Sequence, residues 1–150
     1  MKNRKAKMSD VKEIQCLINY YADKGLMLPR SLNMLYENIL ELTVLEDNGK
    51  IVAVGGLHVI WENLAEIRSL AVSEDYLGKG LGKKVVKLLL SEAENLELSK
   101  VFALTYQQAF FEKCGFRVIE KDDLHQKVWK ECINCPKFPN CDEVAVAIDL

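Results

Sequence analysis

Hydrophobic positions follow a helical period in three stretches of the chain. Val11, Ile14 and Ile18 recur at helical spacing directly after Ser9-Asp10, which can cap a helix. A second helix is predicted from Ser31 onwards. The third and longest stretch follows residue 80, and its apolar face is predicted to comprise Leu81, Val85, Leu88, Leu89, Ala93 and Leu96.

Strand patterns occupy much of the remaining chain. Residues 42–46 and 51–61 are predicted to be two strands joined by Asp47-Asn48-Gly49, a strong hairpin signal. Gly55 and Gly56 inside the second strand indicate a bulge or a close backbone approach. Further strands are predicted at 67–72, 101–106, 116–120 and 144–148, with a short helix at 107–113. No repeat or linker interrupts this order, so we expect one α/β domain over residues 1–150.

Composition and charge narrow the class of protein. The 150 residues are 49% hydrophobic and 28% charged, with a formal net charge of −2. That balance argues against a nucleic-acid partner, which normally requires a strongly basic face. The basic run at residues 2–7 is followed by no apolar segment of a signal peptide, and no stretch of about 18 apolar residues could span a membrane. We therefore expect a cytoplasmic protein.

A glycine-rich segment, Leu77-Gly78-Lys79-Gly80-Leu81-Gly82-Lys83, joins the strand at 67–72 to the longest helix. Glycines let the backbone approach a ligand closely, and a helix N-terminus directs unpaired N–H groups at the same point. Together they predict a phosphate site. The segment is not a nucleotide-triphosphate loop, because Lys84 stands where Ser or Thr is required. Nor does it follow the first strand of a βαβ unit, as a dinucleotide fingerprint does.

With Leu70-Ala71-Val72 before it, this segment resembles the acetyl-CoA signature of the GCN5-related N-acetyltransferases (GNAT), except that Leu77 replaces a Gln or Arg. The match of Ala109 and Gly115-Phe116 to a second family motif supports the resemblance. It implies a mixed, mostly antiparallel sheet flanked by helices, with acetyl-CoA in a splay between the fourth and fifth strands. The cofactor-binding residues that it implies are Leu70, Ala71, Val72, Leu77, Gly78, Lys79, Gly80, Leu81, Gly82, Lys83 and Phe111.

Acyl transfer from a thioester to an amine requires a base, because an amino group is mostly protonated near neutral pH. Relatives that acetylate histones carry their base glutamate in an Ala-Glu-Ile context, which implies Glu66 here. A backbone N–H near Leu70 or Ala71 would stabilise the oxyanion, as in the family. Phe111 stands where the family has a proton-donating Tyr and cannot serve as the acid. Either Tyr106 protonates the thiolate, or the thiolate leaves unassisted.

The resemblance is narrower to the short amino-acid N-acetyltransferases and to the acetyltransferase domain of N-acetylglutamate synthase, which opens arginine biosynthesis. It rests on Ala65-Glu66-Ile67-Arg68-Ser69-Leu70-Ala71-Val72 and on the segments at 25–31 and 132–143. An L-glutamate acceptor has two carboxylates, which cationic side chains would bind. The candidates are Arg30, Arg68, Lys127 and Lys130.

Cysteines and histidines give weaker signals. Cys132, Cys135 and Cys141 could hold a structural zinc ion if His125, Asp142 or a neighbouring subunit supplied the fourth ligand, and structural or redox-sensing thiols are the alternatives. Cys16 and Cys114 lie on predicted helices and are expected to be buried or inert. The two histidines, His58 and His125, are predicted to be packing or surface residues.

Two other functions remain open from the sequence. The acceptor could be another small amine or a protein N-terminus, with the same fold and cofactor. Alternatively, the chain could be an acetyl-CoA-sensing module without turnover, which Leu77 and Phe111 favour because both remove polar groups that the family often uses. A homodimer is compatible with either function.

Overall fold

One twisted sheet runs through the computed structural model, which describes residues 1–124 and 142–150. Its strands lie in the order β1-β2-β3-β4-β5-β7-β6, and all neighbours are antiparallel except β4 and β5, which are parallel. The mixed sheet confirms the expected fold class. The strands are β1 (Lys2–Lys5), β2 (Leu42–Asp47), β3 (Lys50–Trp61), β4 (Leu64–Val72), β5 (Lys100–Thr105), β6 (Arg117–Ile119) and β7 (Val144–Asp149).

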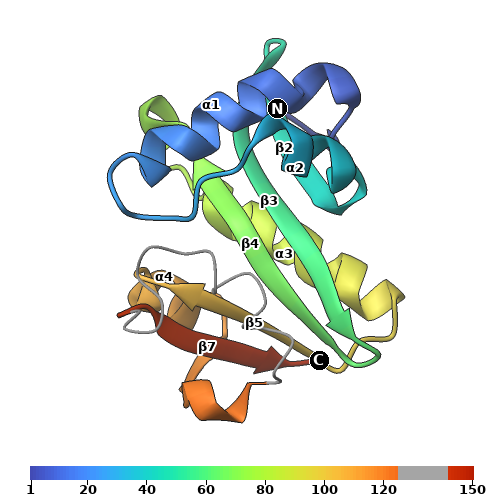
Figure 1. The fold of residues 1–150 in the computed structure, drawn as a ribbon, viewed down its shortest axis with the longest axis vertical. Coiled ribbons are helices and arrows are strands. Elements are labelled where there is room, and N and C mark those ends of the chain that lie inside the picture. Colours follow the sequence, from blue (N-terminus) through green and yellow to red (C-terminus); the bar gives the residue numbers. More distant parts are fainter. Residues whose placement is uncertain (125–141) are drawn as a thin grey trace.

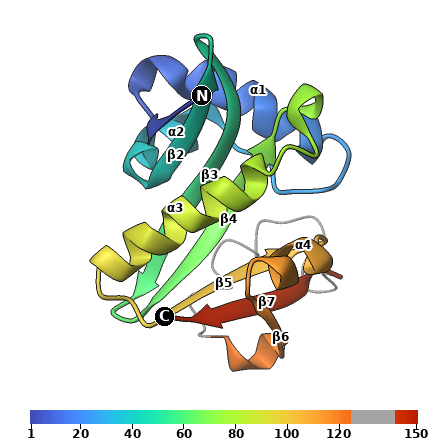
Figure 2. The same ribbon diagram turned by 180° about the vertical axis from the view of Figure 1, so that it is seen from behind.

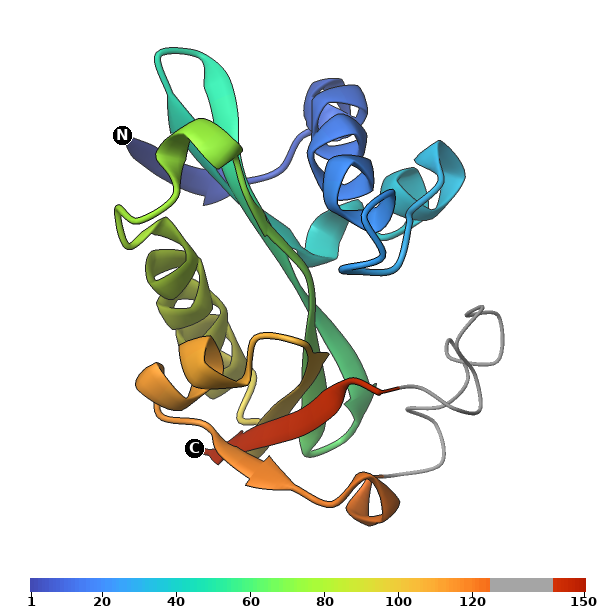
Figure 3. The same cartoon turned by 90° about the vertical axis from the view of Figure 1, so that its left-hand side faces the viewer.

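Helices cover both faces of the sheet (Figure 3). The predicted helices α1 (Val11–Ala22) and α2 (Leu32–Glu37) lie on one face, with the short 3-10 turn η2 (Ile39–Glu41) after α2. On the other face α3 (Leu81–Asn95) crosses the strands and α4 (Gln108–Lys113) lies beside it (Figure 2). Within the described residues, no helix is long and apolar enough to cross a membrane.

The buried face of α3 differs from the predicted one at three positions. Leu81, Val85, Leu89 and Ala93 are buried as expected, and Val86 joins them, whereas Leu88 is half-buried. The prediction for Leu96 was wrong, because its side chain is 54% exposed. The helix ends at Asn95 and the chain turns at Glu97 with φ of +65°, so that Leu98 instead of Leu96 reaches the core.

The β2–β3 hairpin and the glycines of β3 follow the sequence prediction. Asn48 and Gly49 have φ of +51° and +80°, the positive values that a type I′ turn requires. Between the pairs Val54–Ala71 and Gly56–Arg68, β3 has one residue, Gly55, and β4 has two, so the bulge lies in β4 opposite Gly55 and not in β3. A Cβ on Gly55 would lie 2.6 Å from Val85 of α3, which confirms the other expectation, a close backbone approach.

Strand β1 was not predicted, because its Lys-Asn-Arg-Lys sequence has no apolar alternation. It pairs with β2 at the edge of the sheet, and Arg4 lies between two carboxylates. Arg4 Nη1 is 2.7 Å from Asp10 Oδ2, and Arg4 Nη2 is 2.8 Å from Glu46 Oε1. The hydrogen bond from Arg4 lowers the pKa of Asp10, and both carboxylates raise the pKa of Arg4. We call these three residues the Arg4 cluster.

Strands β4 and β5 are paired at one end only. Their register pairs are Leu64 with Lys100, Ala65 with Val101, and Glu66 with Phe102. Beyond Glu66 no pair joins the two strands, and they diverge toward the loop that leads into α3 (Figure 1). We call this unpaired region, residues 67–72 of β4 and 103–105 of β5, the splay. It is the feature that the GNAT resemblance implies between the fourth and fifth strands.

Candidate active site

The glycine-rich segment 77–83 comprises the end of the loop after β4 and the first residues of α3, at the open end of the splay. Gly78 and Gly80 have φ of +79° and +77°, which L side chains rarely adopt, and a Cβ on either would have no atom within 4 Å. The conformation thus requires glycine while the space around both residues stays open. A ligand can therefore approach this backbone closely.

The N-terminus of α3 is suited to an anion. Gly80 is the N-cap, no side chain in the described part of the chain caps this helix, and its first turn contains no acidic residue. Instead Lys83 and Lys84 lie there, at the positive end of the helix dipole. Positive charges at this end are unfavourable by themselves, so a bound phosphate would relieve their repulsion.

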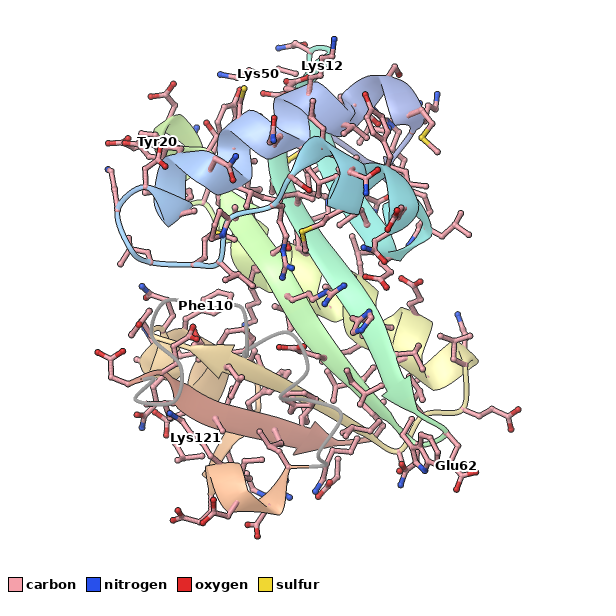
Figure 4. The ribbon with its side chains drawn as sticks, viewed as in Figure 1. Lys12, Tyr20, Lys50, Glu62, Phe110 and Lys121 are labelled. Carbon is pink, nitrogen blue, oxygen red and sulfur yellow. The ribbon has the colours of Figure 1, made fainter. Side chains whose placement is uncertain are left out.

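Gly82 has a different role in the same segment. A Cβ there would lie 3.1 Å from the Phe110 ring and 3.7 Å from Val72. The glycine thus lets α4 pack closely against the start of α3, and Phe110 lies at this junction (Figure 4). Three glycines that look alike in sequence therefore serve backbone conformation in two cases and packing in the third.

The backbone of β4 presents polar groups to the splay. Ser73 N–H donates to Val52 O at 2.8 Å. Along an antiparallel strand, the backbone N–H and C=O groups of successive residues point alternately toward the paired strand and away from it. The N–H and C=O of Val72 therefore point away from β3. The hydroxyl of Tyr21, at the end of α1, donates to Val72 O at 2.5 Å, and burial raises the pKa of Tyr21. Amide groups of an extended ligand could pair with this edge.

Glu66 lies where the paired part of β4 ends. Its register partners are His58 on β3 and Phe102 on β5, and only 9% of the residue is exposed. Its neighbours Ala65 and Ile67 pack into the core with α3, so alternation places Glu66 on the opposite face, which α1 and α2 cover farther along β4. The structure thus places the predicted base beside the splay.

Three charged or titratable side chains gather next to Glu66. Glu41 Oε1 is 2.6 Å from His58 Nδ1, and Glu41 Oε2 is 3.3 Å from Arg68 Nη2. We call Glu41, His58 and Arg68 the Glu41 cluster. The sequence did not single out Glu41, and the prediction of a packing or surface role for His58 missed this contact. The pairing of β3 with both β4 and β2, which η2 precedes, brings these residues together, so their spacing in the sequence carries no signal.

Arg30 and Arg68, two of the predicted substrate-binding residues, lie near each other. Arg30 is 6% exposed, and its Nε donates to Ser69 Oγ at 3.1 Å. Ser69 is the extra residue of the β4 bulge, with φ of +59°. Asn19 and Gln15 of α1 bind the backbone of Arg30, so the end of the loop 25–30 is fixed. The two arginines line one narrow cavity of about 10 Å³ with Met34, Leu35, Asn38, Glu41, Leu42, Gly56 and Ser69.

The two aromatic candidates lie beyond the splay. Tyr106 follows β5, and its hydroxyl donates to Asp142 Oδ1 at 2.6 Å. Phe111 is 4% exposed, and its ring contacts Phe110 and Phe116 edge-on, with centroids 5.2 and 5.1 Å away. Little of the Phe111 ring is left for a cofactor to contact.

The predicted metal ligands Cys132, Cys135 and Cys141, with His125 and the substrate candidates Lys127 and Lys130, lie outside the described residues. Residues 1–124 and 142–150 contain no group of three His, Cys, Asp or Glu that could hold a metal ion. Cys16 is exposed, so of the two expectations for this thiol, buried or inert, the first does not hold. Cys114 is half-buried, and burial raises its pKa.

Comparisons with known proteins agree with this geometry. A model of the acetyltransferase (GNAT) family matches residues 9–116. The chain is similar to an uncharacterized N-acetyltransferase, CT2212, of Chlorobaculum tepidum, with 36% identity over 143 residues, 95% of this chain and 92% of that protein. It is 40% identical to an amino-acid acetyltransferase of Mycobacterium tuberculosis over 131 residues, 85% of this chain and 75% of that protein. The crystal structure of Rv2747 from M. tuberculosis, in complex with CoA and NLQ, matches with a TM-score of 0.88 and 34% identity, covering 100% of this chain and 99% of that one.

Proposed function

The chain belongs to the GNAT acetyltransferase family and is an acetyl-CoA-dependent N-acetyltransferase, and from that premise we propose that it acetylates the α-amine of an amino acid, L-glutamate before others. The observation that carries this proposal is the pair of arginines, Arg30 and Arg68, on one cavity beside the strand that holds Glu66. The similarity to a protein named amino-acid acetyltransferase supports it. N-acetylglutamate made in this way would enter arginine biosynthesis.

The splay and its loop fit the two polar parts of acetyl-CoA. The backbone of 77–83 and the N-terminus of α3 would bind the pyrophosphate, with Lys79 and Lys83 nearby in the chain. The polar groups of residues 70–72 that face the splay would bind the pantetheine arm in the manner of an added strand. Bound acetyl-CoA supplies the activated acetyl group, and the chain supplies position and proton transfer.

The acceptor amine must lose a proton before it can attack. We propose that Glu66 accepts this proton, directly or through a water molecule. The amine nitrogen then bonds to the thioester carbon, and a backbone N–H near Leu70 or Ala71 stabilises the oxyanion. When the C–S bond breaks, the thiolate can leave without an acid, because thiols ordinarily have pKa values of about 8.5. Tyr106 is the candidate acid if one acts.

Arginine side chains would select the acceptor. A guanidinium binds a carboxylate through two parallel N–H···O bonds, which fixes orientation as well as charge. Arg30 and Arg68 lie on different elements, the loop before α2 and strand β4, so they could contact two carboxylates of one acceptor. Lys127 and Lys130 stay predictions for the same role.

The experiment is the release of free thiol from acetyl-CoA in the presence of each amino acid in turn, at saturating cofactor. The proposal expects the highest kcat/KM with L-glutamate and lower values with L-aspartate and L-glutamine. Turnover with a peptide N-terminus or a polyamine, but with no amino acid, would contradict it. Binding of acetyl-CoA without turnover on any amine would instead indicate a sensing module.

A further inference from the structure

In every turnover the candidate base Glu66 must release the proton that it has accepted. Its buried position makes direct release to solvent difficult. Only 9% of the residue is exposed, and it lies between His58 and Phe102 in the sheet. Phe102 is fully buried and apolar, so it can carry no proton. Of the two register partners of Glu66, only His58 has a group that can accept one.

His58 has the orientation and exposure for this task. As direct cross-strand partners, His58 and Glu66 have Cβ atoms about 5 Å apart on the same face of the sheet. Their side chains can therefore meet directly or through one water molecule. The His58 side chain is 31% exposed, so the imidazole could connect the less exposed carboxylate to solvent.

Glu41 determines which nitrogen of His58 is available. An ionised carboxylate can only accept hydrogen bonds, so Nδ1, 2.6 Å from Glu41 Oε1, carries a proton. In the neutral ring Nε2 is then the acceptor. Arg68 Nη2, 3.3 Å from the other carboxylate oxygen, holds Glu41 from the opposite side. A carboxylate fixed in this way both orients the imidazole and stabilises the imidazolium when it forms.

We propose that His58 is the proton-transfer residue that removes the proton from Glu66 in each cycle, and that Glu41 is the positioning residue for His58. This proposal rests on the proposed role of Glu66. The ammonium group of the acceptor gives one proton to the Glu66 carboxylate, Glu66 passes it to His58 Nε2, and the imidazolium releases it to solvent. The attacking nitrogen loses a second proton as the amide forms, and the departing thiolate takes up one, so each turnover releases one net proton to solvent and no other reactant is needed. Within residues 1–124 and 142–150, the charged groups near the imidazole are Glu41 from η2 and Glu66 and Arg68 from β4.

The test is the pH profile of kcat for the wild type, His58→Gln and Glu41→Gln, with free imidazole as a replacement base. Val59→Ala, at an exposed position next in the chain, is the matched control. We expect His58→Gln to lower kcat about 10- to 100-fold at pH 7, and to recover it with imidazole or at higher pH, where solvent can accept the proton. Glu41→Gln keeps the shape of the side chain but not its charge, and should lower kcat several-fold without changing the affinity for acetyl-CoA.

A wild-type profile in His58→Gln would overturn the proposal. The proposal would also be overturned if His58→Gln lowered kcat by the same factor at every pH and imidazole did not restore it, because a purely structural role has this effect. Should His58→Gln fold poorly, Glu41→Gln decides alone, by whether the pH profile changes. If the wild type turns over no amine, the proposed function fails instead, so the two failures are distinguishable.

Discussion

Two clusters of three charged or titratable side chains lie on different parts of the sheet, one at the β1 edge and one over the central strands β3 and β4, with opposite charge patterns. In the Arg4 cluster one cation lies between two carboxylates, and in the Glu41 cluster one carboxylate lies between an imidazole and a guanidinium. Their side chains are similarly covered, from 10% to 25% exposed in the first cluster and from 12% to 31% in the second. Burial and ion pairing alone therefore do not distinguish a structural cluster from a functional one.

Location and chemistry distinguish them. The Arg4 cluster joins edge strand β1 to β2 and to the turn before α1, three strands away from β4. Its members, an arginine and two carboxylates, ordinarily keep their charges near neutral pH. The Glu41 cluster borders Glu66 and contains an imidazole, the side-chain type that exchanges protons in that range. We expect stability to depend on the first cluster and turnover on the second.

The largest effect should come from Glu66→Gln, which removes the proposed base while keeping the shape of the side chain. We expect kcat to fall about 100-fold or more, or roughly 3 kcal/mol of activation free energy, with little change in the affinity for acetyl-CoA. Steady-state kinetics and a binding titration measure the two effects. The control is Glu62→Gln, at an exposed position near the tip of the β3–β4 hairpin (Figure 4). Equal kcat in both variants would remove Glu66 from the mechanism.

Next in size is Arg4→Ala, which leaves Asp10 and Glu46 largely buried without their cation. We expect a loss of about 3 kcal/mol in the free energy of unfolding, because removing one partner of a buried pair leaves an uncompensated charge. The matched control is Arg117→Ala. Its pair with Asp149, at 3.1 Å, has side chains that are 53% and 62% exposed, so it should cost less than about 1 kcal/mol. Urea denaturation measures both, and kcat of the folded variants should stay unchanged.

Arg68→Ala tests the functional cluster from its other side. If Arg68 binds a carboxylate of the acceptor, KM for the amino acid should rise about tenfold or more, with a smaller effect on kcat. The same Arg117→Ala variant serves as the control for loss of one positive charge. An unchanged KM would exclude Arg68 from the acceptor site and leave it only the task of holding Glu41.

The smallest effect is a pH dependence of stability that belongs to the Arg4 cluster alone. Since Arg4 lowers the pKa of Asp10 in the folded state, the Asp10 contribution is present above the unfolded pKa of about 3.9. It is lost as the pH falls below this value and through the folded pKa. The difference in urea midpoint between the wild type and Asp10→Asn should be constant from pH 7 to 5 and shrink below about pH 4. A difference in urea midpoint that keeps its full size down to pH 3 would contradict this prediction.

Local signals in the sequence were sufficient for most of the fold. Asn48-Gly49 predicted its turn because two consecutive positive φ values strongly favour these residues. Gly78 and Gly80 indicated the loop for the same reason. Strand β1 was missed because polar edge strands are defined by the neighbour they pair with, here β2, and not by their own pattern. Ser69 adopts positive φ although it is not glycine, so no sequence signal predicted the bulge in β4, and the glycines of β3 indicated only the close backbone approach.

Candidate residues were predictable from the sequence only where their own segment resembles a known motif, as for Arg30 in residues 25–31. Glu66, Arg68 and the glycine loop lie within one short stretch that resembles a known motif. Glu41 and His58 are 17 residues apart, and Tyr21 is 51 residues from Val72. Such contacts depend on the register of the sheet and on how α1 packs, which no pattern within either segment encodes.

The three register pairs that join β4 to β5 have a mechanical consequence. Few backbone hydrogen bonds join the two parts of the sheet between β4 and β5. Separating the parts there should therefore require less free energy than opening any fully paired ladder. A ligand that lies in the splay would act as a missing strand and tie the parts together. At a hundredfold excess over Kd, such a ligand would add about 2.7 kcal/mol to the free energy of unfolding. Amide hydrogen exchange in β5 and β7 should therefore slow when acetyl-CoA binds, and the cosubstrate would act as a part of the fold.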